Sequence, residues 1–397
     1  MASLARPSGP EPAGAAATGA KVRIEAVQDG RGLRRFLDLP ARLYAGDPHW
    51  VPPLLLERKE HLDPAKNPYF KRAEVAYWLA SANGRPVGRI SAQVNHAHLE
   101  HHQDATGHFG FLEAEDDPAV FAALFHTAEA WLRARGMQRA MGPFSLSIND
   151  ECGLLVEGFD TPPYMMMGHA PRFYAPRAEE QGYRKAKDLI CYAFDTTAEL
   201  PAPARRILDK LANVGGLRFR HMDMRRFDDE LRTIVDIFND AWSGNWNFVP
   251  FAPDEVRFLA KSLRPIVRPR DVWIGEVGGE PAAMVVVLPN LNEAIADLGG
   301  RLLPLGWLKL LWRLKVRGTR TARMPLMGVR RRYHGTPRGA ALALGVIDAV
   351  RSHHRDHGAR AAELSWVLED NLPTREIIEM VGGRAYKTYR IFEKALA

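Results

Sequence analysis

Carboxylate and amide side chains that could take up or release a proton cluster at two places in the sequence. One group, 149–151, follows the apparent central strand of the first half of the chain, and the other surrounds a late strand of the second half. Carboxylates at strand ends that face a cleft are good general bases. The candidate catalytic residues are therefore Asp150, Glu363, Asp370 and Asn371. For Asp370 and Asn371 the alternative is capping of the helix that follows.

Anion binding is the second chemistry, and it belongs to a basic, glycine-containing turn. The apolar run 324–329 leads into Arg330-Arg-Arg-Tyr-His-Gly335-Thr-Pro-Arg-Gly339-Ala340, and a helix is expected after it. Free backbone N–H groups and the helix dipole would point at a phosphate there, and glycine lets the backbone approach closely. The alternative is an ordinary strand-to-helix loop whose arginines are solvated.

The elements that must position these residues occur twice. Trp78, Gly84 and Pro86 are echoed at one constant offset by Trp273, Gly279 and Pro281. Each segment predicts a strand, a tight turn and a second strand. Two further echoes occur in the same order along the chain, which indicates two copies of one fold over 21–200 and 215–397.

Each copy has the same coarse order of elements. A strand, helices and the hairpin come first, and a strand, a helix, a strand, a helix and a final strand follow. In the second copy the late helix is expected at about 338–357 and the next strand at 362–368. This order predicts an α/β fold (α+β, mixed sheet) with an antiparallel start and a parallel βαβ element. Residues 1–20, rich in Ala, Gly and Pro, predict a disordered tail.

The second copy resembles a GNAT-type acyltransferase domain, through the pattern at 332–335 and the ending 371–382. The resemblance implies that one strand splays from its neighbour to pair with the pantetheine arm of acyl-CoA, while the loop holds the pyrophosphate. Pro337 and Ile378 depart from the family pattern, which has Gly or Ala and Tyr there. The implied acyl-CoA contacts are Met327, Val329, Arg330, Arg332, Gly335, Arg338, Gly339 and Ala340.

More narrowly, the tandem arrangement resembles a bacterial group of double-GNAT proteins that includes the bacterial ceramide synthases. Residues 109–113, 142–149, 153–163 and 363–371 carry this resemblance. It implies transfer of a long acyl chain from acyl-CoA to the amine of a sphingoid base. Two alternatives stay open: a GNAT-type N-acetyltransferase of a small amine, and a non-catalytic protein that senses acyl-CoA or lipid.

The first copy departs further from the family. Its stretch 114–118 is short and acidic and has no glycine cradle, so it would repel pyrophosphate. We therefore expect the first copy to have lost cofactor binding. Its remaining role would be to supply acceptor-site residues or only packing.

One stretch, 302–317, combines bulky apolar and basic side chains, and it forms part of an insertion over 299–320 in the second copy. Lys309 and Arg313 share one face of an expected helix, and Trp307, Leu311 and Trp312 cover much of the remainder. A basic helix with Trp and Leu opposite is typical of a membrane interface, which suits a lipid substrate. The alternative is a helix docked on the protein with its basic side chains in water.

The charge of this region sets the expected partners. Residues 299–338 hold eleven Lys and Arg and no Asp or Glu, whereas the whole chain carries a net charge of +7. The segment is therefore expected to meet an anion, such as cofactor phosphates or a membrane surface. No nucleic acid is expected, because 330–332 lacks interleaved aromatic side chains that could stack bases.

Composition and length exclude several classes of protein. The chain has 397 residues, of which 46% are hydrophobic and 25% charged, so global disorder is excluded. Two cysteines cannot make a disulfide framework or a four-cysteine zinc site. The five histidines of 96–108 are expected to be solvated, and no metal is expected. With no signal peptide and no transmembrane run visible, a cytoplasmic protein peripheral to the inner membrane is expected.

Overall fold

The computed structural model describes residues 21–211 and 215–396, so the tail expected over 1–20 lies outside the described residues. The first half contains, in order, β1 (Arg23–Ala26), α1 (Gly30–Leu43), α2 (Leu55–His61), η1 (Pro68–Lys71), β2 (Ala73–Ala82), β3 (Arg85–Asn95), α3 (His96–His102), β4 (Thr106–Ala114), α4 (Pro118–Arg133), β5 (Arg139–Gly142), β6 (Leu154–Glu157), α5 (Tyr174–Glu180) and β7 (Arg184–Asp195).

The second half largely repeats this order, with an insertion before its fourth strand, an additional first helix and, among the described residues, no counterpart of β6. It contains α6 (Ala202–Leu211), β8 (Leu217–His221), η2 (Met224–Arg226), α7 (Phe227–Trp242), α8 (Pro253–Leu263), η3 (Pro269–Asp271), β9 (Val272–Val277), β10 (Glu280–Pro289), α9 (Leu291–Ile295), α10 (Gly306–Trp312), η4 (Arg313–Arg317), β11 (Thr321–Val329), η5 (Arg331–Tyr333), α11 (Pro337–Asp356), β12 (Ala361–Leu368), α12 (Leu372–Met380) and β13 (Arg384–Ala395).

The two predicted hairpins are confirmed. Strand β2 pairs antiparallel with β3, and β9 pairs antiparallel with β10. Asn83 and Gly84 both have positive φ, as do Gly278 and Gly279. Positive φ at both central residues matches the twist of the flanking strands, so the residue type at these turns accounts for the hairpins directly.

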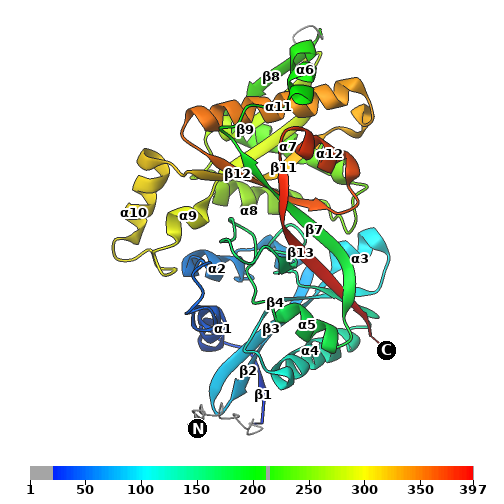
Figure 1. Ribbon diagram of the computed structural model, residues 1–397. Helices are drawn as coiled ribbons and strands as arrows, with labels where there is room; N and C mark the ends of the chain where they lie inside the picture. The colour runs from blue at the N-terminus through cyan, green and yellow to red at the C-terminus, as the bar shows by residue number, and fades with distance from the viewer. Residues whose placement is uncertain (1–20, 212–214, 397) are drawn as a thin grey trace, which may run out of the picture.

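The strands of the described residues form one mixed sheet that runs through both halves (Figure 1). Its order is β1-β2-β3-β4-β5-β13-β7-β12-β11-β10-β9-β8, and β6 pairs with β13 outside this path. The predicted α/β fold with a mixed sheet and a parallel βαβ element is therefore confirmed. The boundaries 21–200 and 215–397 remain a prediction.

The final strands of the two halves are exchanged. Strand β7 ends the first half but pairs with β12 of the second half, where Glu363 is opposite Ala193. Strand β13 ends the second half but pairs with β5 of the first, where Phe392 is opposite Gly142. The two exchanged strands also pair with each other, and Figure 1 shows them crossing the middle of the molecule. Each half therefore completes its sheet with a strand of the other.

Strands β11 and β12 begin as a parallel pair and then part. Their pairing runs from Thr321 opposite Ala361 to Met324 opposite Leu364 and stops, although both strands continue. The next residue of β11 is Pro325, which has no N–H to donate to a ladder. On its other edge, the register of β11 against β10 shifts at the same level. A gap consequently opens between the C-terminal ends of these two strands.

The corresponding gap of the first half is filled by the chain itself. Strands β4 and β5 pair only as far as His108 opposite Met141. The backbone N–H of Phe144 then donates to the carbonyl of Phe109 at 2.7 Å. A Cβ at Gly110 would lie 1.7 Å from the carbonyl oxygen of Phe144, so only glycine allows this approach.

The helices cover both faces of the second-half sheet. Helix α11 is capped by Thr336, whose hydroxyl accepts a hydrogen bond from the N–H of Gly339, and Pro337 is its first residue. Proline suits that position because its missing N–H has no partner in the helix. Helix α11 packs against the core that contains Leu342 and Leu364. Helices α7 and α8 pack on the opposite face around Met284.

Replacing Gly110 with Ala should destabilise the protein by about 2 kcal/mol or more, because the new methyl group would overlap a backbone oxygen that cannot move freely. The free energy of unfolding in urea measures the effect. The matched control is Gly30→Ala, since no atom lies within 4 Å of a Cβ added there. Equal stability of the two variants would contradict the close approach of the segment that begins at residue 143.

Candidate functional site

The gap between β11 and β12 is a narrow slot with a mainly apolar lining. Side chains from both strands and from α7 and α12 surround it. The lining residues are Trp242, Asn245, Met324, Pro325, Met327, Leu364, Ser365, Trp366, Val367, Leu368, Asn371, Thr374 and Ile378. A slot between splayed strands exposes strand-edge N–H and C=O groups to a ligand. Its volume is about 50 Å³ in this structure, so an extended ligand chain enters it only if the surrounding side chains move.

A buried carboxylate lies behind Ser365 at this slot. Glu363 is fully buried, and its Oε1 accepts a hydrogen bond of 2.6 Å from the Ser365 hydroxyl. Its Oε2 accepts a hydrogen bond from the hydroxyl of Tyr386 on β13. Alternation along a strand places residues 363 and 365 on one face of β12. Glu363 thus reaches the slot through one hydroxyl group and has no direct access to it.

Two buried cations accompany Glu363. The Nε of Arg323 donates to the Ser365 hydroxyl at 2.9 Å and lies 3.9 Å from Glu363 Oε1. The ammonium of Lys387, which is 1% exposed, donates to the carbonyls of Thr161 and Pro162. Burial lowers the pKa of Lys387, and the nearby carboxylate of Glu363 opposes that shift. A buried charge is tolerated when it is paired or hydrogen-bonded; Arg323 has the carboxylate of Glu363, and Lys387 has two carbonyl oxygens.

Burial also acts on the phenol that faces Glu363. The pKa of Tyr386 is raised far above its ordinary value, first by burial and then by the adjacent carboxylate. Tyr386 therefore stays protonated and keeps donating to Glu363. One oxygen of the carboxylate is occupied by this phenol, and the other remains directed to Ser365.

The first half supplies the cover of the site. Segment 158–170 lies over the cluster, and it is attached both to the first half, where His169 is 2.7 Å from Asp47, and to the second half. The carbonyl of Met165 accepts from Arg323 at 2.8 Å, and its N–H donates to Asn290. The hydroxyl of Tyr389 donates to the carbonyl of Gly168 at 3.0 Å. The site therefore needs both halves of the chain.

The predicted phosphate loop, residues 330–340, follows β11 as expected. Gly335 has a φ of +67°, and a Cβ at Gly339 would lie 2.1 Å from the carbonyl oxygen of Tyr333. The N–H of Ala340 is already used by the carbonyl of Thr336. In the described part of the chain, no acceptor takes the N–H groups of Gly335 and Arg338. These two amides stand at the N-terminus of α11, where the helix dipole favours an anion.

Two arginines of the phosphate loop form ion pairs with carboxylates in this structure. Arg330 pairs with Asp236 at 2.5 Å, and Arg332 pairs with Glu280 at 2.8 Å. A cavity of about 380 Å³ lies between them. An incoming phosphate would exchange these exposed carboxylate contacts for its own, which costs little because surface ion pairs are weak.

The remaining predicted contacts lie along the same path. The carbonyl of Met327 accepts a hydrogen bond of 3.2 Å from the Trp242 indole, and its side chain lines the slot. The carbonyl of Val329 is 2.7 Å from Nε2 of His334. The structure therefore brings the predicted strand and loop residues together along one edge, from the slot to the start of α11.

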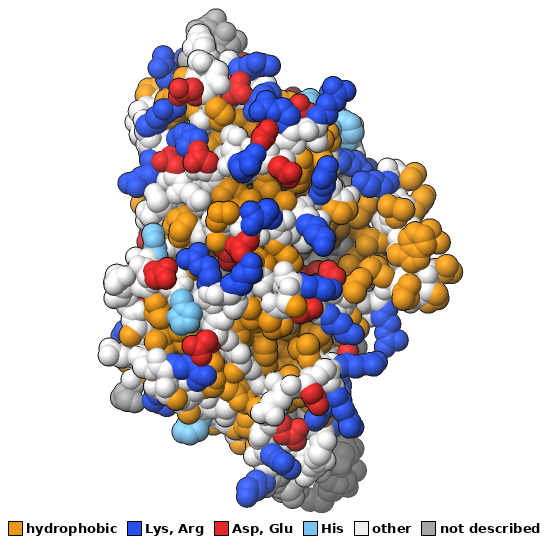
Figure 2. Space-filling model, turned by 180° about the vertical axis from the view of Figure 1, so that it is seen from behind, with side chains coloured by type: hydrophobic (Ala, Val, Ile, Leu, Met, Phe, Trp, Pro, Cys, Tyr) orange, Lys and Arg blue, Asp and Glu red, His pale blue; other side chains and the backbone are white. Residues whose placement is uncertain are grey.

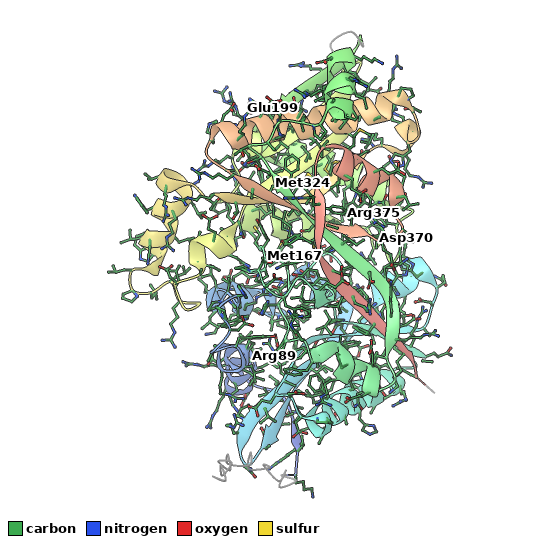
Figure 3. The ribbon with its side chains drawn as sticks, in the orientation of Figure 1. Arg89, Met167, Glu199, Met324, Asp370 and Arg375 are labelled. Atoms are coloured by element: carbon green, nitrogen blue, oxygen red, sulfur yellow. The ribbon has the colours of Figure 1, made fainter. Side chains whose placement is uncertain are left out.

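Of the other catalytic candidates, Asp370 and Asp150 lie away from the slot, and Asn371 lines it. Asp370 is 61% exposed and pairs with Lys187 at 2.8 Å, which lowers its pKa. Figure 3 places it at the side of the molecule, away from Met324 in the middle. Asn371 lines the slot, but its side chain caps α12 by accepting from the N–H of Thr374. Asp150 accepts from the N–H and hydroxyl of Ser147 in the first half.

Sequence reasoning missed four members of the site: Arg323, Ser365, Tyr386 and Lys387. Two of them left a signal. Arg323 is the single charged residue in the otherwise apolar strand 321–329, and Ser365 lies two residues from Glu363. The contribution of β13 had no local signal, because it depends on the strand exchange.

The membrane-contact candidates belong to residues 302–317, which form a projection at the side of the second half (Figure 1). Trp307, Leu311 and Trp312 are about half exposed. Lys309 and Arg313 instead turn toward the protein and pair with Asp297, and together they lower the pKa of that carboxyl. None of the helices in the described ranges is both long and apolar enough to cross a bilayer.

The histidine cluster differs from expectation. His98 and His108 are buried, which corrects the prediction of solvated side chains; their ring centroids are 4.7 Å apart. Burial lowers the pKa of His98 to about 4, although Asp104 lies 3.0 Å away. Helix α3 and the start of β4 place both rings in the core. Among the described residues, no three His, Cys, Asp or Glu side chains are arranged to hold a metal ion.

A second opening lies between α7 and α8. This groove has a volume of about 840 Å³, with an apolar floor that includes Leu231, Val256 and Ala260 and a charged rim. One end contains Asp236, the partner of Arg330. The other end contains Pro265, whose carbonyl accepts from Lys315 of the projection. The groove thus extends between the projection and the phosphate loop.

Comparison with known proteins gives two curated relatives, and no family model matches the chain. The chain is 51% identical over 380 residues to the bacterial ceramide synthase of Caulobacter vibrioides, which covers 96% of this chain and 99% of the relative. It is 45% identical over 365 residues to Protein YghO of Escherichia coli, with coverage of 92% and 93%.

Solved structures agree on the fold. A tandem GNAT protein from the clavulanic acid biosynthesis pathway superposes with a TM-score of 0.56 at 13% identity, covering 95% of this chain and 99% of that one. A GCN5-related N-acetyltransferase from Sphaerobacter thermophilus gives 0.54 at 14% identity, with coverage of 94% and 96%. The tandem GNAT architecture is therefore confirmed.

Replacing Gly339 with Ala should weaken binding of CoA about tenfold, because the added Cβ would push the carbonyl of Tyr333 and deform the loop. Isothermal titration calorimetry with CoA gives the dissociation constant. Gly244→Ala is the control, since no atom lies within 4 Å of a Cβ added there. Unchanged affinity in the Gly339 variant would show that CoA does not use this loop.

Proposed function

Because this chain belongs to the bacterial ceramide synthase family of tandem-GNAT N-acyltransferases, we propose that it moves a long-chain acyl group from acyl-CoA to the amine of a lipid such as a sphingoid base. The observation that carries the proposal is the slot between β11 and β12, which has Ser365 and the buried Glu363 at its inner end. We place the enzyme on the cytoplasmic face of the inner membrane.

The slot and the phosphate loop would each bind one part of the acyl-CoA donor. The pyrophosphate of acyl-CoA would take the free amides of Gly335 and Arg338 together with the arginines of the loop. The pantetheine arm would run along the parted edge of β11 past Met327. The thioester would then lie near Ser365. Pro337 removes one possible amide donor, and the two remaining amides still point to the same anion site.

The cluster around Glu363 suits the proton transfer that amide formation requires. The amine nitrogen attacks the thioester carbon to give a tetrahedral intermediate with a positive charge on nitrogen. Its N–H proton passes to the Ser365 oxygen as the Ser365 proton passes to Glu363. The intermediate then collapses, the C–S bond breaks to leave the amide, and the CoA thiolate takes up through water the proton that Glu363 releases. Arg323 holds the Ser365 oxygen, and Tyr386 holds Glu363, so both groups are positioned before substrate arrives.

Glu363→Gln should lower kcat at least about a hundredfold, because the amide keeps the shape of the side chain but cannot accept the proton. CoA release from long-chain acyl-CoA in detergent micelles, with and without a sphingoid base, measures the rate. Mass spectrometry identifies the amide. The dissociation constant of acyl-CoA should stay unchanged.

Asp370→Asn is the matched control for this substitution, since Asp370 is an exposed carboxylate in a surface ion pair. Its kcat should stay within about twofold of the unmodified protein. A hundredfold loss in the Asp370 variant with full activity in the Glu363 variant would reverse the assignment. Tight binding of acyl-CoA without release in the unmodified protein would indicate a sensor, and acylation of only small amines would indicate an acetyltransferase.

The groove between α7 and α8 suits the alkyl chain of one of the two lipid substrates. Its floor is apolar, and it extends from the projection toward Arg330. Burial of a chain there contributes about 0.8 kcal/mol for each methylene. Both the acyl group and the lipid amine carry such a chain.

Ala260→Trp should lower kcat/KM about tenfold for the long-chain substrate and leave a short-chain analogue unaffected, because the indole would fill the floor of the groove. Varying the acyl chain and the amine chain in separate series shows which of them lies there. Ser262→Trp is the control on the exposed face of the same helix. Equal loss for long and short chains in both series would exclude the groove as a chain site.

A further inference from the structure

The exposed large apolar side chains of the described residues are concentrated at one place. Seven of the nine lie between residues 303 and 316, and an eighth, Leu56, lies on the adjacent helix α2. The seven are Leu303, Leu305, Trp307, Leu308, Leu311, Trp312 and Val316. No residue from 301 to 321 is buried. Single exposed apolar residues are ordinary, but a contiguous group of this kind marks an interaction surface.

The helix of the projection exposes the apolar face that a helix in water normally buries. Leu308, Trp312 and Val316 follow one another at intervals of four residues, which is the spacing of the face a helix normally buries. They are 46%, 52% and 72% exposed. The cations Lys309 and Arg313, which water would solvate well, face the protein and bind Asp297. The ion pairs therefore hold the apolar face outward.

The outward face is framed by positive charge that no carboxylate pairs with in the described residues. In the described part of the chain, no carboxylate lies within 4.0 Å of the charged groups of Arg301, Lys315 and Arg317. All three residues are exposed. Figure 2 shows the apolar side chains of the projection with Lys and Arg at its base. Apolar side chains at the tip and cations at the base match the depth profile of an anionic membrane.

The base of the projection is fixed to the first half. The N–H of Leu55 donates to the carbonyl of Gly300 at 3.0 Å, and a Cβ at Gly300 would lie 2.6 Å from the carbonyl oxygen of Pro53. This contact places the exposed Leu56 beside the projection, on the side of the molecule where Figure 1 shows α2 and α10. The surface therefore extends across both halves and has a fixed orientation relative to the site.

We infer that residues 302–317, with Leu56, insert into one leaflet of an anionic lipid bilayer. The surface is a convex ridge, so it suits a fluid partner that closes around it. This inference deepens the proposed function, because an enzyme held in this way takes its lipid amine from the membrane. Binding is measured without acyl-CoA or amine, so its failure is distinct from failure of the proposed reaction.

Cosedimentation of the full chain with vesicles tests the inference. The unmodified protein should bind phosphatidylcholine vesicles that contain phosphatidylglycerol, and binding should fall as salt rises. The double variant Leu308→Ser/Trp312→Ser should reduce the partition coefficient at least about tenfold. Leu372→Ser is the matched control, because Leu372 is an exposed leucine on α12, away from the projection, and its variant should bind normally.

Two further measurements separate the possible outcomes. Arg301→Gln/Arg317→Gln should weaken binding to anionic vesicles and leave the weaker binding to neutral vesicles unchanged. The melting temperature should be unchanged in all variants, because every substituted side chain is exposed. Failure of the unmodified protein to bind, or equal binding by Leu308→Ser/Trp312→Ser, overturns the inference. A dimer in light scattering that the same double variant dissociates, without vesicle binding, would assign the ridge to a second copy of the chain.

Discussion

The antiparallel pairing of β7 with β13 is the interaction on which the remainder of the structure depends. These two strands join the half-sheets into one sheet, and each stands in the half opposite to the one whose sequence it ends. The exchange brings Tyr386 and Lys387, from the C-terminal end of the chain, to Glu363 on β12 and to segment 158–170 of the first half. Without it, the carboxylate would lose the phenol that orients it, and the cover of the site would lose its anchor.

Burying a cluster of charges at the junction of two half-sheets costs free energy, and local hydrogen bonds offset that cost. Arg323, Glu363 and Lys387 are each less than 5% exposed, and each has hydrogen-bond partners. Such a cluster is satisfied only when both halves are in place, because its acceptors come from the segment 158–170. The first half, whose own inter-strand gap is filled by the chain, thus contributes to the site as cover and as host for β13.

The projection and the slot both adjoin strand β11. Residues 299–320 leave the sheet after β10 and return at β11, the strand that parts from β12. The groove between α7 and α8 links the two regions, since Pro265 touches Lys315 and Asp236 touches Arg330. The groove therefore extends from the projection toward the phosphate loop.

The sequence by itself determined the features that depend on neighbouring residues. The turn residues Asn83-Gly84 and Gly278-Gly279, which adopt positive φ, specify the two hairpins. The repeat and the glycine-containing turn before α11 indicated a tandem GNAT fold with a phosphate loop. Only the tertiary structure decided the exchange of β7 and β13. The backbone groups of a strand form the same hydrogen bonds with any partner strand, so the sequence of a strand does not specify its neighbour. It also decided that Glu363 is buried behind Ser365 while Asp370 faces water, and that the apolar side of α10 points outward. A periodic pattern defines the faces of a helix or strand, but the contacts across the fold determine which face is covered.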